Sequence, residues 1–395
     1  MLIRHGLVSC DSHGQLDRNA FTERMSASKW GDRIPQVIEL DLDGEKAEGW
    51  TMNGKPPRGR AEGFGFATVN CPAVMEDRRH YPSRWDEVPR KVYDPIERAK
   101  ALDDDGVDGE VLFPNNPIAS FNFAFDDPEY EVACVEAYND ALGAWTQVSD
   151  RYIPVAIIPY LNSIETVVRQ VEMAVKKGHR GVVMLAEPSL CITGAKSLND
   201  PFWEPLWATC QDLGVPINWH GSAGLAGRLS VPDWSGYTRR QAHTVSTGRL
   251  AATPCQLLPN LMFSGILDRY PRLKWAFAET GAGWLAFVLE SCDHEWERQH
   301  LWTEGILTRP SDAFRRQVYV DFWFERSGID LRHFLGIDHL MWESDYPHIT
   351  STFPNSREHV ARTVGHLPAD ERKQLLYENA LRLYDIEFDV APELA

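Results

Sequence analysis

Residues 153–186 read IPVAIIPYLNSIETVVRQVEMAVKKGHRGVVMLA, and this stretch decides the fold class. An apolar, β-branched run at 153–159 is followed by a helical pattern from Ser163 to Lys177, and a second apolar run follows at 181–186. Gly178, directly after the helical pattern, is a residue that commonly ends helices. Two short apolar runs joined by one helix are typical of a β-α-β unit, in which the two strands pair in parallel.

The same alternation continues in both directions along the chain. Eight parallel strands are the number that closes a (β/α)8 barrel, and eight apolar runs of strand length occur here. We therefore predict an α/β fold, a (β/α)8 TIM barrel that forms a single domain over residues 1–395. The expected strands are 7–10, 107–113, 153–159, 181–186, 215–219, 273–278, 318–322 and 339–342, and further helices are expected at 95–105, 129–148, 201–213 and 369–383.

Two long segments interrupt this alternation. Residues 14–91 follow the first strand and are rich in Gly, Pro and Arg, so we expect an insertion that caps the catalytic rim. Residues 221–271 form a second insertion after the fifth strand, with one extra helix over 244–257. Aromatic residues of the first insertion are candidates to line an apolar pocket, and its arginines are candidates to bind an anionic substrate group, although a solvated loop face explains the arginines equally well. These aromatic residues are Trp30, Trp50, Phe64, Tyr81 and Trp85, and the arginines are Arg58, Arg60, Arg78 and Arg79.

The composition excludes several classes of partner. The formal net charge is −17, which argues against nucleic acid and against an anionic membrane surface. No apolar run reaches the ~18 residues that a membrane span needs. The seven cysteines form no CxxC pair, which suits a reducing compartment, and the first ten residues lack the length of a signal peptide. We expect a cytoplasmic enzyme with a small-molecule substrate, and a homodimer because homodimers are common among soluble enzymes.

Imidazole and carboxylate side chains follow most of the predicted strands. Because barrel enzymes carry their active sites where the strands end, we expect these groups to converge on one rim. Asp11 and His13 are two residues apart on an extended segment, so both side chains point to the same side. The candidates are Asp11 and His13 (first strand), Glu187 (fourth), His220 (fifth), Glu279 (sixth), and Asp345 and His348 (eighth).

This set of residues can hold a divalent metal. Asp11, His13, His220 and Asp345 would complete a site for one Zn, Fe or Mn ion that activates water. Glu187 and Glu279 are extra carboxylates that would bind a second ion or act as a general acid or base. An isolated D-x-H motif is a weak signal, and an ordinary loop carboxylate is the favoured interpretation of Glu187. The prediction rests on the joint pattern.

Several segments resemble a known family over about residues 7–383. The chain is similar to the amidohydrolase superfamily, in the branch of the aminocarboxymuconate-semialdehyde decarboxylase-like enzymes. The resemblance implies a metal-binding barrel, with Asp11 and His13 where the family usually carries an HxH pair, His220 as the ligand on strand five, Asp345 as a group that binds metal or activates water, and His348 as its partner. The matching segments are CDSHG (10–14), DGVDGEVLFPN (105–115), GHRGVVML (178–185), INWHG (217–221), FAETGAGW (277–284), MWESDYPH (341–348) and YENALRLY (377–384).

One departure from the family pattern bears on the reaction. Many members, including the decarboxylases, have a His where this chain has Glu279. We therefore predict a metal-dependent hydrolase of an ester, thioester, amide or lactone, in which Asp345 orients and deprotonates the water. The alternative is a metal-dependent, non-oxidative decarboxylase of an aromatic or enoic acid, and a third interpretation is a barrel that only binds a ligand. The substrate is expected to be an aromatic or coenzyme A-linked acid.

Overall fold

The computed structural model describes residues 1–42, 45–55, 69–77, 82–118, 125–221, 235–249 and 251–394. Of the predicted insertion residues, Phe64, Tyr81 and the four arginines 58, 60, 78 and 79 lie outside these ranges. Within the described ranges, no helix is both long and apolar enough to cross a membrane.

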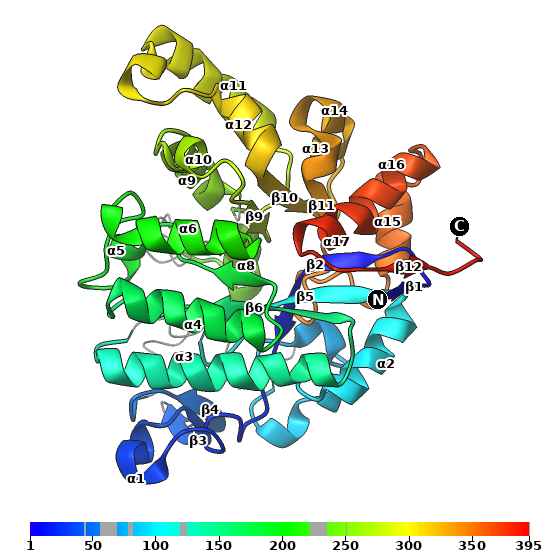
Figure 1. The fold of residues 1–395 in the computed structure, drawn as a ribbon. Coiled ribbons are helices and arrows are strands. Elements are labelled where there is room, and N and C mark those ends of the chain that lie inside the picture. The colour runs from blue at the N-terminus through cyan, green and yellow to red at the C-terminus, as the bar shows by residue number, and fades with distance from the viewer. Residues whose placement is uncertain are drawn as a thin grey trace.

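Eight parallel strands form the central sheet, which confirms the predicted barrel (Figure 1). Their spatial order is β11-β10-β9-β8-β7-β6-β5-β2. The barrel closes between β2 and the segment after β11, where the Asp345 N–H donates to the Asp11 carbonyl at 2.9 Å and the His13 N–H to the Tyr346 carbonyl at 2.7 Å. The strands are β2 (Val8–Gly14), β5 (Gly109–Pro114), β6 (Tyr152–Ile157), β7 (Gly181–Val183), β8 (Ile217–His220), β9 (Trp275–Ala278), β10 (Val318–Phe322) and β11 (Leu340–Trp342).

The first strand is longer than the sequence suggests. Its pairing with β5 continues beyond Cys10, with Ser12 opposite Leu112 and Gly14 opposite Pro114, and an irregularity lies between Ser9 and Ser12. This part of β2 contains polar residues, so a prediction based on apolar runs ends the strand too early. As a result, Asp11 and His13 lie on the strand itself and not on a loop after it.

Helices cover the outside of the barrel, as predicted for α/β alternation (Figure 1). Asp94 caps the first of them through the Ile96 and Glu97 N–H groups, and Gly106 ends it in the left-handed conformation. The predicted last helix is present as three consecutive helical segments, the middle one a π-helix. The helices are α2 (Pro95–Asp105), α3 (Pro128–Gly143), α4 (Ile164–Lys176), α5 (Pro188–Cys191), α6 (Glu204–Leu213), α11 (Leu285–Arg298), α12 (Pro310–Gln317), α13 (Ser327–Asp330), α14 (Arg332–Leu335), α15 (Ser356–Val364), α16 (Ala369–Lys373), the π-helix (Gln374–Glu378) and α17 (Asn379–Leu383).

The second insertion differs from its prediction. The single extra helix expected over 244–257 is wrong, because α8 (Arg239–Gly248) and α9 (Ala252–Met262) are separate helices, followed by α10 (Ile266–Arg269). Pro254 explains the break, since its ring would clash with the preceding turn of a continuous helix but fits the first turn of α9.

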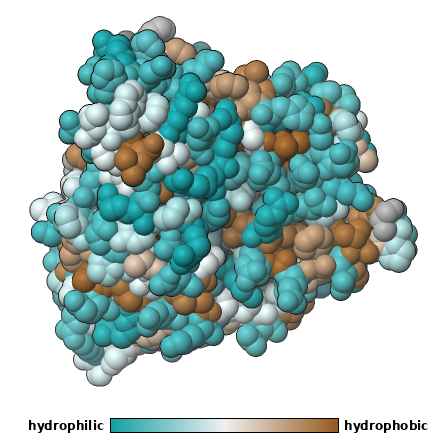
Figure 2. Space-filling model, turned by 45° about the horizontal axis from the view of Figure 1, so that its top comes forward, coloured by the Kyte–Doolittle hydropathy of each residue, from teal (hydrophilic) through white to brown (hydrophobic). Residues whose placement is uncertain are grey.

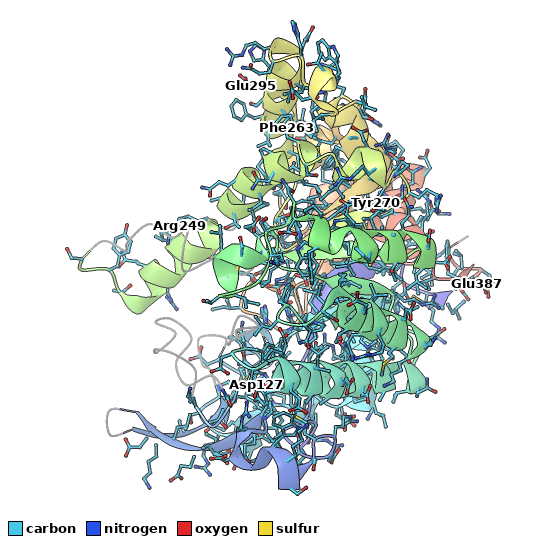
Figure 3. All side chains as sticks on the ribbon, turned by 60° about the vertical axis from the view of Figure 1, so that its left-hand side comes forward. Asp127, Arg249, Phe263, Tyr270, Glu295 and Glu387 are labelled. Atoms are coloured by element: carbon cyan, nitrogen blue, oxygen red, sulfur yellow. The ribbon has the colours of Figure 1, made fainter. Side chains whose placement is uncertain are left out.

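The first insertion carries a short helix, α1 (Ala27–Trp30), and an antiparallel hairpin of β3 (Gln36–Leu42) and β4 (Glu45–Thr51). Trp50 packs edge-on against Phe21 and Trp85, and all three are buried, as is Trp30. The described tryptophans therefore belong to the buried core that the insertion shares with the barrel. In Figure 3 this hairpin and α8, whose end Arg249 marks, extend from the barrel on the same side of the view.

The two ends of the chain lie together. Strand β1 (Leu2–Ile3) pairs in parallel with β12 (Asp389–Val390), and Figure 1 shows both termini on one side of the barrel.

One main cluster of buried apolar side chains extends from Ile3 to Tyr384. On the face that Figure 2 shows, hydrophilic residues predominate and hydrophobic residues form separate patches.

Candidate active site

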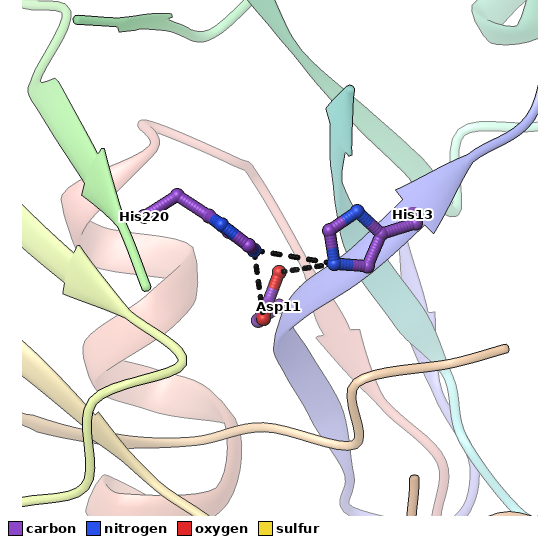
Figure 4. Close-up of side chains that lie close together, drawn as sticks. All are labelled: Asp11, His13 and His220. Carbon is purple, nitrogen blue, oxygen red and sulfur yellow. Dashed lines mark hydrogen bonds and ion pairs between the residues drawn. The ribbon is translucent and has the colours of Figure 1, made fainter. Parts of the chain in front are cut away.

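Acidic and imidazole side chains meet at the carboxyl ends of three strands. Asp11 and His13 come from β2, His220 ends β8, and Asp345 follows β11. Figure 4 shows the first three converging. The His220 Nε2 lies 3.2 Å from the His13 Nε2 and 3.4 Å from the Asp11 Oδ2, and the His13 Nε2 lies 3.3 Å from the Asp345 Oδ1. Four of the predicted site residues thus lie together.

The arrangement of these atoms fits a divalent cation. Ligand atoms around a four-coordinate ion with bonds of about 2.0–2.1 Å lie about 3.4 Å apart, close to the separations here. Both Asp11 carboxylate oxygens are buried without a hydrogen-bond partner, which is costly unless a cation pairs with them. Among the described residues, Asp11–His13–His220 and His13–Asp345–His348 are the two groups compact enough to hold an ion, and they share His13.

His13 is prepared to act as a neutral ligand. Its Nδ1 donates to the Pro114 carbonyl at 3.0 Å, which leaves the Nε2 lone pair facing the cluster. Burial and the neighbouring His348 lower the pKa of His13 to about 4, so the ring is uncharged at neutral pH.

His220, unlike His13, favours its protonated, charged form. Burial by itself would lower its pKa, but the Asp11, Glu279 and Asp345 carboxylates raise it to about 9. These three carboxylates therefore favour positive charge beside them, and the protonated His220 ring supplies it when no ion is bound. A divalent cation would take over this role and release the His220 proton.

Asp345 and His348 form a second pair beside this cluster. The His348 Nδ1 lies 3.0 Å from the Asp345 Oδ1, and its ring stacks on His13 with centroids 3.7 Å apart. Burial opposes the charged form, but His348 and His13 hold the pKa of Asp345 below its usual range, and Asp345 in turn raises the pKa of His348. Thr350 also donates to the Asp345 Oδ2. The His348 Nε2 is buried without a partner.

Glu279 joins the site from β9. Its Oε2 lies 3.6 Å from the His220 Nε2, and burial together with the Asp345 and Asp11 charges raises the pKa of Glu279 to about 8. Glu279 and Asp345 both adopt a left-handed backbone, with φ of 54° and 53°. Non-glycine residues rarely adopt this conformation, and when they do they tend to cluster at functional sites.

The structure does not bring Glu187 into this cluster. Its carboxylate accepts hydrogen bonds within its own loop, from the Ser189 hydroxyl at 2.6 Å and the Leu198 N–H at 3.3 Å. Neither of the metal-capable groups of the described residues includes it. These contacts agree with the favoured interpretation of Glu187 as an ordinary loop carboxylate, and they leave its suggested metal role without support.

Two buried carboxyl groups next to the site escaped the sequence search. Asp321 lies inside β10 and Glu343 directly follows β11, and both side chains are buried. Burial and the Asp11 charge raise the pKa of Asp321 well above its usual range. Burial and the Asp321 and Asp11 charges raise the pKa of Glu343 in the same way. A signal was available, because an acidic residue in the apolar strand VYVDF is unusual.

The chain is similar to several known proteins. The chain is 24% identical over 343 residues to the γ-resorcylate decarboxylase of Polaromonas sp. (strain JS666), a match that covers 81% of this chain and 96% of the relative. An amidohydrolase of Mycobacterium avium subsp. paratuberculosis K-10 has a similar structure, with a TM-score of 0.72, 18% identity, and coverage of 96% of this chain and 98% of that one.

A third similar protein was solved with a metal. The dihydroxybenzoic acid decarboxylase of Polaromonas sp. JS666, with bound manganese and the inhibitor 2-nitroresorcinol, has a TM-score of 0.57, 20% identity, and coverage of 76% of this chain and 89% of that one. At these identities the two solved structures support the fold alone. The sequence model of the amidohydrolase family matches residues 68–386, which is most of the chain and includes every candidate site residue except Asp11 and His13. This chain therefore belongs to the amidohydrolase family.

Proposed function

We propose that this protein is a metal-dependent, non-oxidative decarboxylase of a small aromatic acid of the γ-resorcylate kind. The observation that carries the proposal is the Asp11–His13–His220–Asp345 cluster in a chain similar over most of its length to a γ-resorcylate decarboxylase. This places the decarboxylase, which the sequence offered as the alternative, ahead of the hydrolase. It also favours an aromatic substrate over a coenzyme A-linked one.

Asp11, His13, His220 and Asp345 would hold a single divalent ion, and manganese is our first choice because a similar protein binds it. When bound, the ion supplies positive charge that orients the substrate carboxylate and an adjacent oxygen. Before binding, His13 offers its lone pair, and two buried carboxylates supply the charge that the ion balances.

The reaction replaces a carboxylate on the ring by hydrogen. The bond between the ring carbon and the carboxylate carbon breaks, carbon dioxide leaves, and a proton bonds to the ring carbon. Glu279 is our candidate for the proton donor, because its carboxyl group is mostly buried and lies beside His220. His348 is tied through its Nδ1 to Asp345, and we assign it the role of orienting that carboxylate.

The hydrolase remains the second candidate, because Glu279 stands where decarboxylases of the resembled branch carry a His, and a carboxylate can activate water. One isotope experiment separates the two. The Mn²⁺-loaded protein is incubated in D₂O with hydroxybenzoates labelled with ¹³C in the carboxyl group, and in H₂¹⁸O with aryl esters and lactones.

We expect labelled carbon dioxide and one deuterium on the ring carbon that carried the carboxylate. Asp345→Asn should abolish both signals, which shows that they come from this site. Incorporation of ¹⁸O into an acid product, with no release of labelled carbon dioxide, would overturn the decarboxylase and establish the hydrolase.

A further inference from the structure

The turn after β9 holds Glu279 in a conformation that a free chain would avoid. Glu279 has a φ of 54°, where the Cβ of an L-residue crowds its own backbone. Two residues later Gly281 is also left-handed, with a φ of 64°. A backbone of this shape persists only where the surrounding structure holds it, so the groups that bond to this turn decide where the Glu279 carboxyl group lies.

The Glu343 carboxylate is hydrogen-bonded to the backbone of Glu279. Its Oε2 accepts a hydrogen bond from the Glu279 N–H at 2.8 Å, and its side chain is completely buried. The Glu343 backbone is fixed in turn, because its N–H donates to the Phe322 carbonyl of β10 at 2.9 Å. Glu343 therefore links the end of β11 to the turn after β9 across the intervening strand β10.

The far end of the turn is held separately. The Glu325 Oε1 accepts from the Ala282 N–H at 2.8 Å, and the Trp284 indole donates to the Gly281 carbonyl at 2.6 Å. These contacts fix the end of the turn but do not touch the N–H of Glu279. Among the described residues, Glu343 is the group that bonds to the N–H of Glu279, the residue whose side chain enters the site.

We propose that Glu343 is a positioning residue that holds Glu279 in its left-handed conformation and so aims the Glu279 carboxyl group at His220 and the substrate. The proposal rests on the proposed function in one respect, namely that Glu279 serves the reaction. It adds a residue that touches neither metal nor substrate and acts only through Glu279.

The hydrogen bond of Glu343 suggests how to test it. One carboxylate oxygen of Glu343 accepts from the Glu279 N–H, so a side chain that keeps an oxygen acceptor at this point should keep the turn in place. Gln keeps this acceptor, because its carbonyl oxygen can accept from the Glu279 N–H. Met has a similar length but offers only a weakly accepting sulfur.

The experiment compares Glu343→Gln and Glu343→Met with a control, Glu131→Met. Glu131 is an equally buried carboxylate that accepts the Tyr160 and Leu161 N–H groups in the loop after β6, at 2.7 and 2.9 Å, outside the site. We expect Glu343→Met to lower kcat by about 10- to 100-fold with KM little changed, since a misplacement of about 1 Å can cost about 10²-fold. Glu343→Gln should stay within about threefold of the parent, and Glu131→Met should lower the melting temperature but not kcat.

A double variant tests whether Glu343 acts through Glu279. In a Glu279→Gln background, Glu343→Met should lower kcat no further, because the residue that it positions has already lost its function. An additional loss equal to that in the parent would overturn the proposal. If Glu343→Met does not fold, Glu343→Asp takes its place, because its shorter side chain cannot reach the Glu279 N–H.

A readout independent of the reaction keeps the two proposals separate. Hydrogen exchange of the Glu279 amide should be fast in Glu343→Met and slow in the parent and in Glu343→Gln, whatever the substrate. Unchanged protection in Glu343→Met would overturn the positioning role. Loss of protection in a protein that decarboxylates no aromatic acid would uphold the positioning role and reject the proposed function.

Discussion

Replacing Gly221 by Ala tests whether the position of the Glu279 carboxyl group controls activity. Gly221 directly follows His220, has a φ of 46°, and donates its N–H to the Ala278 carbonyl at 2.8 Å. A Cβ added at this glycine would lie 2.7 Å from the Glu279 Oε2, whereas ordinary contact begins at 3.4 Å. The Glu279 carboxyl group would have to move by several tenths of an ångström.

Two separate losses follow from this substitution. Placing Ala in the left-handed region costs about 1 kcal/mol of unfolding free energy, because its Cβ approaches the backbone. Displacing Glu279 should lower kcat by about tenfold or more, because misplacement of a reacting group by about 1 Å can cost about 10²-fold. The second loss should show in kcat more than in KM, since Glu279 is not proposed to bind the substrate.

Gly214→Ala is the matched control. Gly214 ends α6 with a φ of 69°, and a Cβ there would meet nothing within 4 Å. Urea unfolding should give similar losses of stability for the two variants, and the decarboxylation assay should give a loss of kcat for Gly221→Ala alone. Equal kcat values in the two variants would refute the reasoning that places Glu279 against Gly221 in the working site.

Three further predictions concern metal, pH and a buried ion pair. Asp11→Asn removes a buried carboxylate, and elemental mass spectrometry after dialysis should find the manganese content far below the one ion per chain expected of the parent; full retention would contradict a ligand role. His179 is buried with its Nε2 donating to the Asn139 carbonyl, and burial lowers its pKa from 6.5 to about 4. Its protonation therefore favours the unfolded state, so urea unfolding should show stability falling by up to about 3 kcal/mol as pH drops from 6.5 towards 4, and a His179→Leu variant with the same slope would contradict this. Arg98→Met leaves the fully buried Glu110 unpaired and should cost about 3–5 kcal/mol in thermal unfolding, whereas adding Glu110→Met should restore most of it; no recovery would mean that the pair is not the cause.

The barrel could be predicted from sequence because its signals are local. Each strand and each helix of the unit around α4 shows its own apolar period, and Gly178 and Gly106 mark the ends of neighbouring helices. The positions of Asp11, His13, His220 and Asp345 followed from the same information, since the carboxyl ends of parallel strands in a closed barrel all face one rim. The structure brings these four side chains together.

Other features depended on contacts that no local pattern reports. The break between α8 and α9 was readable from Pro254, but the π-helical segment near the C-terminus and the hairpin of β3 and β4 were not expected. The same strand-end argument that placed His220 correctly also suggested Glu187, whose carboxylate bonds within its own loop. A position at a strand end predicts that a residue lies at the rim of the barrel, but it does not predict the direction of the side chain.

The sequence by itself therefore determined the barrel, its rim and a set of candidate ligands. Only the tertiary structure decided which candidates meet, that Glu279 is held left-handed against Gly221, and that the buried Glu343 bonds to the Glu279 N–H. The physical reason is that periodicity is a property of neighbouring residues, whereas Glu279 and Glu343 are 64 positions apart and their bond depends on the register of β9, β10 and β11.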